Sequence, residues 1–365
     1  MISVIPQIFI IFVGSLEIHK IMKKIILSFL SVAAAVAFAG CAKNVPNGPN
    51  DANKRYFDAW MKVNHPDAKP TGLGIYVLEN EDGTGKEVEM EGYVLMDYKT
   101  TDLEGNILTY TDSETAKQLG TYNVGDYYGP KFQTTIENTV TAGLAEALVG
   151  MKVGGHKKVI IPSWLLSYKS YDSEEDYLAA STSAANTVYD ITVKDFTTDI
   201  FEWQVEKIGG YFKENSDIFG AMTVTDSIPD FKGFYYKSLS EVKDTTSFPK
   251  DTTIYINYTG RLLNGNVFDT TNERLAKDCG IWSASRTYEP VSIKWAEAYS
   301  DLTMGSESST VISGFALTLW QMHKFEKGIG VFVSDYGYGY SGSGESIPGY
   351  SPLVFEIEVV AKPEN

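Results

Sequence analysis

Aromatic side chains and one carboxylate gather toward the C-terminal end of the 365-residue chain, at spacings that could form one site. Phe268 and Asp269 are neighbours, Tyr338 lies in a glycine-rich stretch, and Phe355 follows shortly after it. No strong nucleophile and no cluster of metal-ligating residues accompanies them in the sequence. These residue types indicate an apolar binding pocket rather than a bond-breaking centre, so neither a metal nor another cofactor is expected.

The segments that carry these residues alternate as half-buried strands do. Apolar residues occupy every second position over residues 254–258 and again over residues 355–359. Asn264 and Gly265 mark a tight turn after the first strand, and a return strand begins at Val267. Strands, turns and loops are therefore expected to hold the aromatic residues.

The order of predicted elements occurs twice along the chain. A helix with aromatic residues precedes each copy, and strands, one short helix and further strands follow it. We therefore interpret the chain as a duplication with its joint near Thr198. Each copy fits an α+β unit in which a helix covers one face of an antiparallel sheet. The matching segments are residues 55–63 and 201–215, 74–77 and 233–236, 94–98 and 255–258, 143–151 and 314–322, and 189–193 and 355–359.

The second copy carries, in order, the motifs Tyr258-Thr259-Gly260, Phe268-Asp269, Val311-Ile312, Tyr338-Gly339, Ile347-Pro348 and Phe355. Through these motifs it resembles the FK506-binding protein (FKBP) family of peptidyl-prolyl cis-trans isomerases over nearly all of residues 228–362. The resemblance implies a curved antiparallel sheet wrapped around a short helix, with a proline-binding pocket between them. It implies two tandem FKBP-like domains for the whole chain.

Carried over position by position, the resemblance implies a catalytic set and a substrate-binding set of residues. It also implies proline-containing protein clients and macrolide ligands of the FK506 type. The catalytic set is Tyr258, Phe268, Asp269, Tyr338 and Phe355. The substrate-binding set is Val311, Ile312, Phe315, Ile347 and Arg274.

The second copy differs from the usual family pattern at several positions. Phe315 stands where the family usually has Trp, and Gly349 replaces the second proline of an Ile-Pro-Pro flap. Arg274 falls where the family often pairs an Arg with the Asp, here Asp269. Residues 276–309 are longer than the usual connection, and we expect their aromatic residues either to grip unfolded clients or to pack onto their own domain.

The residue types favour the same activity on physical grounds. Rotation about a peptidyl-prolyl bond has a barrier of about 18–20 kcal/mol, so the unaided reaction takes tens to hundreds of seconds. The barrier is the amide resonance that is lost on twisting, and the twisted state is less charge-separated than the planar states. A dry aromatic pocket stabilises the twisted state relative to water and needs no nucleophile.

The first copy keeps apolar residues at the predicted core positions but loses most of the site. Tyr98 is retained, whereas Leu108 and Thr109 replace the Phe-Asp pair, and no Ile-Pro flap follows. We therefore predict a degenerate FKBP-like domain over residues 55–198. An FKBP-type isomerase domain with a helical lead-in is predicted over residues 199–365.

A secretory signal is indicated near the N-terminus. Two lysines precede a short apolar run that ends in Ala39-Gly40-Cys41. This junction resembles the lipobox of bacterial lipoproteins, which implies cleavage before Cys41 and lipidation of its sulfur. The predicted signal peptide is then residues 1–40, with translation starting at Met22, and residues 41–54 are predicted as a flexible tether. An uncleaved transmembrane anchor is the alternative.

The formal net charge of −16 argues against a nucleic-acid partner, because phosphate binding needs a basic surface. We expect a protein that is lipid-anchored to the bacterial outer membrane, on a side that the sequence leaves open. It is expected to act there as a prolyl isomerase and folding helper of the cell envelope. The alternative is a non-catalytic lipoprotein subunit of an outer-membrane complex that binds a protein or a glycan.

Overall fold

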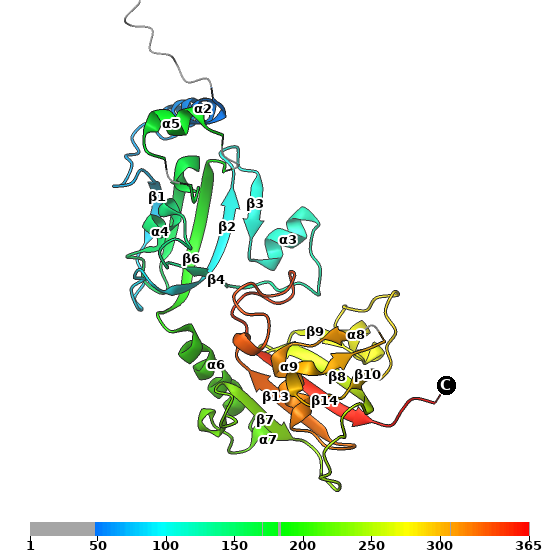
Figure 1. Ribbon diagram of the computed structural model, residues 1–365. Helices are drawn as coiled ribbons and strands as arrows, with labels where there is room; N and C mark the ends of the chain where they lie inside the picture. Colours follow the sequence, from blue (N-terminus) through cyan, green and yellow to red (C-terminus); the bar gives the residue numbers. More distant parts are fainter. Residues whose placement is uncertain (1–47, 170, 182–183, 307, 365) are drawn as a thin grey trace, which may run out of the picture. The chain divides into compact units, whose positions relative to one another are not determined.

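The computed structural model describes residues 48–169, 171–181, 184–306 and 308–364, which contain two antiparallel sheets (Figure 1). The predicted signal peptide and Cys41 lie outside the described residues. Within the described ranges, no helix has both the length and the apolar character that a membrane span needs.

The first residues described belong to a small helical unit, made of the beginning of α2 (Pro49–Asn64) and of α5 (Glu174–Ala179). Asn50 is buried in it, and its side-chain amide donates a hydrogen bond to the Tyr177 carbonyl over 2.9 Å. The predicted tether over residues 41–54 is therefore wrong for its last residues, which are helical. Proline suits the first turn of a helix because its missing N–H has no helical partner there.

The first sheet is antiparallel throughout and has its long strands in the middle. Its order along the sheet is β1 (Tyr76–Glu81), β5 (His156–Ile161), β6 (Thr187–Thr197), β2 (Tyr93–Thr101) and β3 (Ile107–Tyr110), and β4 (Lys131–Thr134) also pairs with β2. Helix α4 (Ala142–Leu148) covers one face and buries Leu144 and Leu148. Alternate residues of β2 and β6, such as Val94 and Ile191, complete this core.

The second sheet has the same strand arrangement as the first, with two further short strands at one edge. Its order is β12 (Ser309–Thr310), β11 (Thr303–Met304), β10 (Val291–Lys294), β8 (Thr253–Leu262), β14 (Leu353–Val360), β13 (Lys327–Phe332) and β7 (Phe234–Ser238), and β9 (Val267–Thr270) also pairs with β8. All pairings are antiparallel. Helix α9 (Ser313–Trp320) lies in this copy as α4 does in the first (Figure 1).

Element by element, the two copies correspond. Strands β1 to β4 match β7 to β10, β5 and β6 match β13 and β14, and α4 matches α9. A short helix follows the third strand in both copies, α3 (Ser113–Leu119) in the first and α8 (Glu273–Asp278) in the second. The prediction of two tandem α+β domains, each an antiparallel sheet with a short helix, is confirmed.

Two helices cover opposite faces of the second sheet. Phe355 and the buried residues of α9 belong to one apolar cluster. The neighbouring residue Val354 belongs to another, with Ile208 and Phe212 of α6 (Ile200–Glu214). Successive residues of a strand point to opposite faces, so α6 packs on the face away from α9. The predicted helical lead-in is thus part of the core of the second copy.

Candidate functional site

Four aromatic rings from four different elements meet in the second copy. Phe315 of α9 lies edge-to-face against Tyr258 of β8 and against Phe355 of β14, with ring centroids 5.3 and 5.1 Å apart. Phe268 of β9 packs edge-on against Phe355 at 5.6 Å. These spacings are typical of favourable aromatic pairs. The four rings are called the aromatic cluster below.

The aromatic cluster has a buried base and a half-buried border. Tyr258, Phe315 and Phe355 are buried, as is Ile347, whereas Phe268 is half-buried. Further half-buried predicted residues pack against the same core, namely Val311, Ile312 and Tyr338. The predicted pocket residues other than Asp269 and Arg274 therefore belong to this core or pack against it. The half-buried border is the part of the cluster that a ligand could contact.

Gly260 allows the rings to lie close to the backbone of β8. A Cβ atom added at this position would stand 2.5 Å from the ring of Phe268 and 2.9 Å from that of Phe355. Both distances are shorter than a normal contact. Glycine is therefore required at Gly260 by close approach rather than by backbone conformation.

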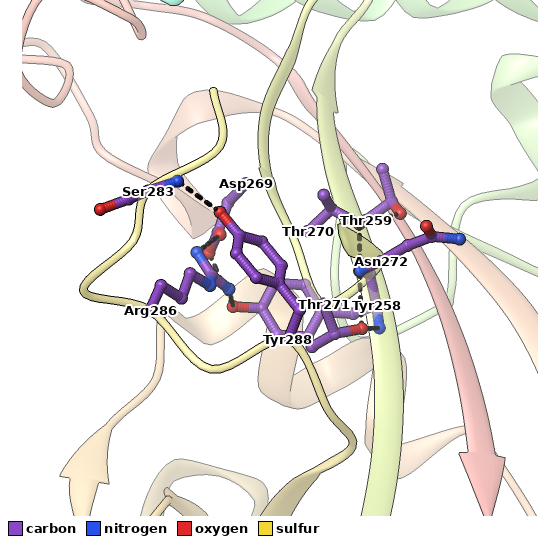
Figure 2. A network of polar contacts seen from close by, with 9 residues as sticks. All are labelled: Tyr258, Thr259, Asp269, Thr270, Thr271, Asn272, Ser283, Arg286 and Tyr288. Carbon is purple, nitrogen blue, oxygen red and sulfur yellow. Dashed lines mark hydrogen bonds and ion pairs between the residues drawn. The ribbon is translucent and has the colours of Figure 1, made fainter. Parts of the chain in front are cut away.

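A charged network borders the aromatic cluster (Figure 2). The Tyr258 hydroxyl donates to one carboxylate oxygen of Asp269 over 2.6 Å. Arg286 forms an ion pair with the other oxygen of Asp269. A second guanidinium nitrogen of Arg286 donates to the Tyr258 hydroxyl oxygen over 3.1 Å. Three side chains from three segments thus fix one another, and the forked geometry of arginine makes this double contact feasible.

The environment keeps these groups in fixed protonation states. Burial, reinforced by the charge of Asp269, raises the pKa of the hydroxyls of Tyr258 and Tyr338 above the ordinary tyrosine value. Burial alone disfavours the charged form of Arg286, but Asp269 and Tyr258 outweigh it and raise the pKa of the guanidinium. Tyr258 therefore remains a neutral donor and Arg286 remains a cation at physiological pH.

Arg274 does not pair with Asp269, and this prediction is wrong. Its side chain is 92% exposed in α8 and lies 3.8 Å from Asp278 on the same helix. Arg286, which follows within the long connection, takes the predicted role instead. Both arginines lie between Asp269 and β10, so the sequence contained the correct candidate. The position of Arg274 in the family pattern favoured the wrong one.

Threonine side chains hold β9 against β8 and so place Asp269 (Figure 2). The backbone N–H of Tyr258 donates to the Thr271 hydroxyl over 2.9 Å. The Thr259 and Thr270 hydroxyls lie 2.9 Å apart, and Asn272 N–H donates to Thr270 over 3.1 Å. These bonds are buried or nearly so, which makes them costly to break.

The flap over residues 337–350 contains hydrogen bonds that hold its backbone within the second copy. Gly339 N–H donates to the Ser334 carbonyl over 2.9 Å, and Tyr350 N–H donates to the Gly339 carbonyl over 2.8 Å. A Cβ at Gly349 would stand 2.1 Å from the Tyr340 carbonyl oxygen. This close approach explains why glycine, and not the second proline of the family, occupies the position.

The N-terminus of α9 borders the cluster as well. Ile312 is its N-cap residue, and among the described residues no side chain caps the helix there. The first N–H groups of a helix have no partner within the helix. Backbone donors beside an apolar border are suited to hold the carbonyl of a bound peptide.

The aromatic residues of the long connection mostly pack onto their own domain. Trp295 is buried and stacks on Trp320 with centroids 5.2 Å apart. Tyr299 packs edge-on against Phe231 at 5.5 Å. Trp282 is 44% exposed. The packing interpretation is therefore favoured for Trp295 and Tyr299, and Trp282 keeps a surface that a client could contact.

In the first copy the corresponding positions form no such cluster. Leu108 is 49% exposed in β3, and Leu144 lies where the second copy has Phe315. Thr109 stands at the position of Asp269, and its hydroxyl lies 2.6 Å from that of Thr100. The aromatic walls and the carboxylate are both replaced.

A separate groove of about 750 Å³ lies elsewhere in the second copy. It is lined by residues 244–255 in part, by Phe325 and by the end of β14. It contains none of the predicted site residues. Cavity size alone therefore does not identify the site, whereas the aromatic cluster and its charged border do.

Comparisons with known proteins show which family both copies match. The family model of the FKBP-type peptidyl-prolyl cis-trans isomerases matches residues 87–194 and again residues 245–360. These two matches fall on the two sheets described above.

Two individual relatives are similar to this chain. A probable FKBP-type peptidyl-prolyl cis-trans isomerase of Haemophilus influenzae is 26% identical over 254 residues, which cover 68% of this chain and 86% of that protein. FK506-binding protein 1A of Aspergillus fumigatus is 30% identical over 125 residues, which cover 34% of this chain and 90% of that protein.

Among solved structures, the crystal structure of the three FKBP domains of wheat FKBP73 matches 80% of this chain and 95% of that chain. The match has a TM-score of 0.28 and 17% sequence identity. The family assignment rests on the two family-model matches, which together span more than half of the chain. The chain belongs to the FKBP-type peptidyl-prolyl cis-trans isomerases and carries two tandem copies of their domain.

Proposed function

We propose that the second copy performs the isomerisation and that the aromatic cluster is its binding and catalytic site. The proposal rests on one observation: four aromatic rings pack together, and one charged network lies at their border. A proline ring is apolar and compact, so it suits the half-buried edge of Phe268 beside the buried rings.

The proposed mechanism is preferential binding of the twisted amide. Planar amides are the more charge-separated states, and an apolar wall of aromatic rings favours the twisted state over them. Ile312 N–H and the Tyr338 hydroxyl are suited to hold carbonyl groups on either side of the proline. Asp269, fixed by Tyr258 and Arg286, would supply a negative charge for the carbon of the twisted carbonyl. No bond is made or broken, so no nucleophile is needed.

The cellular role that we propose is folding assistance in the bacterial envelope, with lipid-modified Cys41 as the anchor. Support comes from the sequence, where a basic and then apolar stretch ends in Ala39-Gly40-Cys41. The clients would be unfolded proteins that contain proline, and macrolides of the FK506 type are the expected competing ligands. Replacing Cys41 by Ser should move the protein from the membrane fraction to the soluble fraction. Unprocessed protein that stays in the membrane would instead indicate an uncleaved anchor.

The test of the activity is a proline-peptide isomerisation assay on the mature chain. Phe268→Ala and Asp269→Val should each lower kcat/KM about tenfold or more, because lost pocket contacts are worth about 1–3 kcal/mol. Circular dichroism should show an unchanged fold, since both side chains are half-buried. Full activity in both variants would contradict the proposed site. Binding of an unfolded protein without any isomerase rate would support the non-catalytic alternative.

A further inference from the structure

Arg286 reaches the site from a loop that has little regular structure of its own. Residues 280–290 connect α8 to β10, and Arg286 is half-buried near the middle of this loop. A long cationic side chain on a loop has many rotamers, and fixing it costs up to about 2 kcal/mol of entropy. Something in the loop must therefore restrict Arg286 before it contacts Asp269.

Tyr288 makes two contacts that restrict this loop (Figure 2). Its hydroxyl accepts a hydrogen bond from the backbone N–H of Ser283 over 2.9 Å, which closes the loop around Arg286. Its ring lies under the guanidinium, with the Arg286 Cζ atom 5.5 Å from the ring centroid. The distance is within the range of a cation–π contact. One side chain thus shapes the backbone and supports the cation.

The start of the loop is fixed independently of Arg286. Gly280 ends α8 with a φ of 70°, a conformation that favours glycine, and Ile281 N–H donates to the Ala276 carbonyl over 2.9 Å. Lys277 lies over the Trp282 ring at 5.4 Å, and Trp282 Nε1 donates to Glu273 over 3.2 Å. Between Trp282 and β10, the Arg286 N–H donates to the Ser283 carbonyl over 3.3 Å, and Tyr288 spans this same turn.

We propose that Tyr288 is a positioning residue for the isomerase site, which acts by presenting Arg286 to Asp269 and Tyr258. The inference rests on the proposed function of the second copy. Tyr288 itself need not contact the substrate. Its hydroxyl sets the loop and its ring sets the guanidinium, so that both oxygens of Asp269 are engaged when a peptide arrives.

The first copy contains the same loop without the cation and supplies a matched control. Asn123 N–H donates to the Tyr128 hydroxyl over 3.0 Å, as Ser283 does to Tyr288. Asp126, at the place of Arg286, accepts a hydrogen bond from the Asn123 side chain over 2.8 Å. The tyrosine contact thus forms without an arginine, so loop closure can be separated from presentation of the cation.

The experiment is a double-mutant cycle on the mature chain, with kcat and KM measured on a proline peptide. Arg286→Ala should lower kcat/KM about tenfold, since a hydrogen bond to a charged group is worth about 1.5–3 kcal/mol. Tyr288→Leu should lower it about fivefold, mostly in kcat. Tyr288→Phe keeps the ring and should lower it less. The double variant Tyr288→Leu with Arg286→Ala should match Arg286→Ala within about twofold, because interacting residues are not additive.

The outcomes separate positioning from a purely structural role. If the losses of kcat/KM in the two single variants multiply in the double variant, Tyr288 acts independently of Arg286 and the proposal is overturned. Tyr128→Leu in the first copy removes the same loop contact and should leave kcat/KM unchanged. If Tyr128→Leu lowers the rate as much as Tyr288→Leu, the effect is general stability and the proposal fails. Unchanged rates in the Tyr288 variants, with Phe268→Ala still impaired, would reject this inference alone. An active Phe268→Ala variant would reject the proposed function itself.

Discussion

The two copies share a hydrogen-bonded frame and differ in the groups that the frame holds. In the first, Tyr98 N–H donates to the Thr111 hydroxyl over 3.0 Å; in the second, Tyr258 N–H donates to Thr271 over 2.9 Å. In each copy, a lysine lies over an aromatic ring at the start of the following loop, at 5.3 and 5.4 Å. The strand order around these contacts is the same.

What differs is the chemistry of a few side chains. The second copy places Phe268, Asp269 and Arg286 on this frame, whereas the first has Leu108, Thr109 and Asp126. The exchange removes an aromatic wall, a carboxylate and its cation together. The comparison indicates that the frame is maintained by its own packing and hydrogen bonds, and that the site depends on residues that the frame does not need.

The largest expected effect tests whether the first copy contributes any catalysis. The double variant Phe268→Ala with Asp269→Val in the mature chain should lower kcat/KM about a hundredfold, since each change removes about 1–3 kcal/mol of binding at separate parts of the site. Leu108→Ala with Thr109→Val, at the matching positions of the first copy, should leave the rate unchanged. A substantial rate that persists in the first variant and falls in the second would show that the first copy is active.

A smaller effect is expected from exchanging one residue of the frame. Gly260 pairs with Asp269 across the ladder, and Thr100 pairs with Thr109 in the same way. Gly260→Thr should destabilise the second copy by about 1–3 kcal/mol, because the new side chain would overlap the rings of Phe268 and Phe355. Chemical denaturation measures the change. Gly260→Ala is the graded comparison, since its Cβ alone meets the same two rings and should destabilise the second copy less than Gly260→Thr. A Gly260→Thr protein as stable as the original would mean that the rings can move aside.

The smallest effect at neutral pH concerns a tyrosine of the second sheet that is buried with α6, because its loss of stability appears only at alkaline pH. Tyr76 in β1 and Tyr235 in β7 pair with Ile160 and Val331, at matching positions of the two sheets. Tyr76 is half-buried, whereas Tyr235 is buried within the cluster that includes α6. Burial raises the pKa of Tyr235 to about 12.

An unfolded tyrosine has a pKa of about 10, so the folded value of Tyr235 is the higher one. Its contribution to stability is full below pH about 10 and is lost as the pH rises to about 12. The loss approaches about 1.4 kcal/mol per pH unit in that window. Tyr235→Phe should flatten the fall of stability between pH 10 and 12, as followed by urea denaturation, and Tyr76→Phe is the matched control. Equal slopes for Tyr235→Phe and the original chain would contradict the assignment.

The sequence predicted the strands and the aromatic cluster because both depend on local or family-wide patterns. Alternation of apolar residues specified β8 and β14, and glycine and asparagine specified the turn between β8 and β9. Both faces of β14 are buried at its start, and toward its end the half-buried Glu356 and the exposed Glu358 mark one face. Tandem copies followed from the repeated order of these elements.

The site was predicted less completely, because its cation is placed by tertiary contacts. Arg274 had the expected linear position, but α8 turns it toward solvent and the loop after α8 brings Arg286 to Asp269. The residues around Arg286 in the sequence do not indicate its contact with Tyr288. A comparison of the copies was the available signal, since Lys117, Gly120 and Tyr128 recur at the same spacing as Lys277, Gly280 and Tyr288.

The sequence also did not show which part of the long connection lacks a counterpart in the first copy. Residues 276–309 are longer than the usual family connection, but the segment up to β10 has a counterpart before β4 in the first copy. The part without a counterpart carries β11, β12 and Trp295. The beginning of α2 was missed because prolines, glycines and asparagines near residue 49 favour a coil, and Asn50 is held by a contact distant in the sequence.

The position of α6 on the second sheet has a consequence for how the chain can be divided. The family match of the second copy starts at residue 245, after both α6 and β7. A fragment cut there would lose the strand that pairs with β13 and would leave Val331 and Val354 without their cover. An unpaired strand beside a bare apolar face invites intermolecular pairing. Recombinant fragments that begin at the family boundary should therefore precipitate, whereas those that begin at Asp199, the N-cap of α6, should stay in solution.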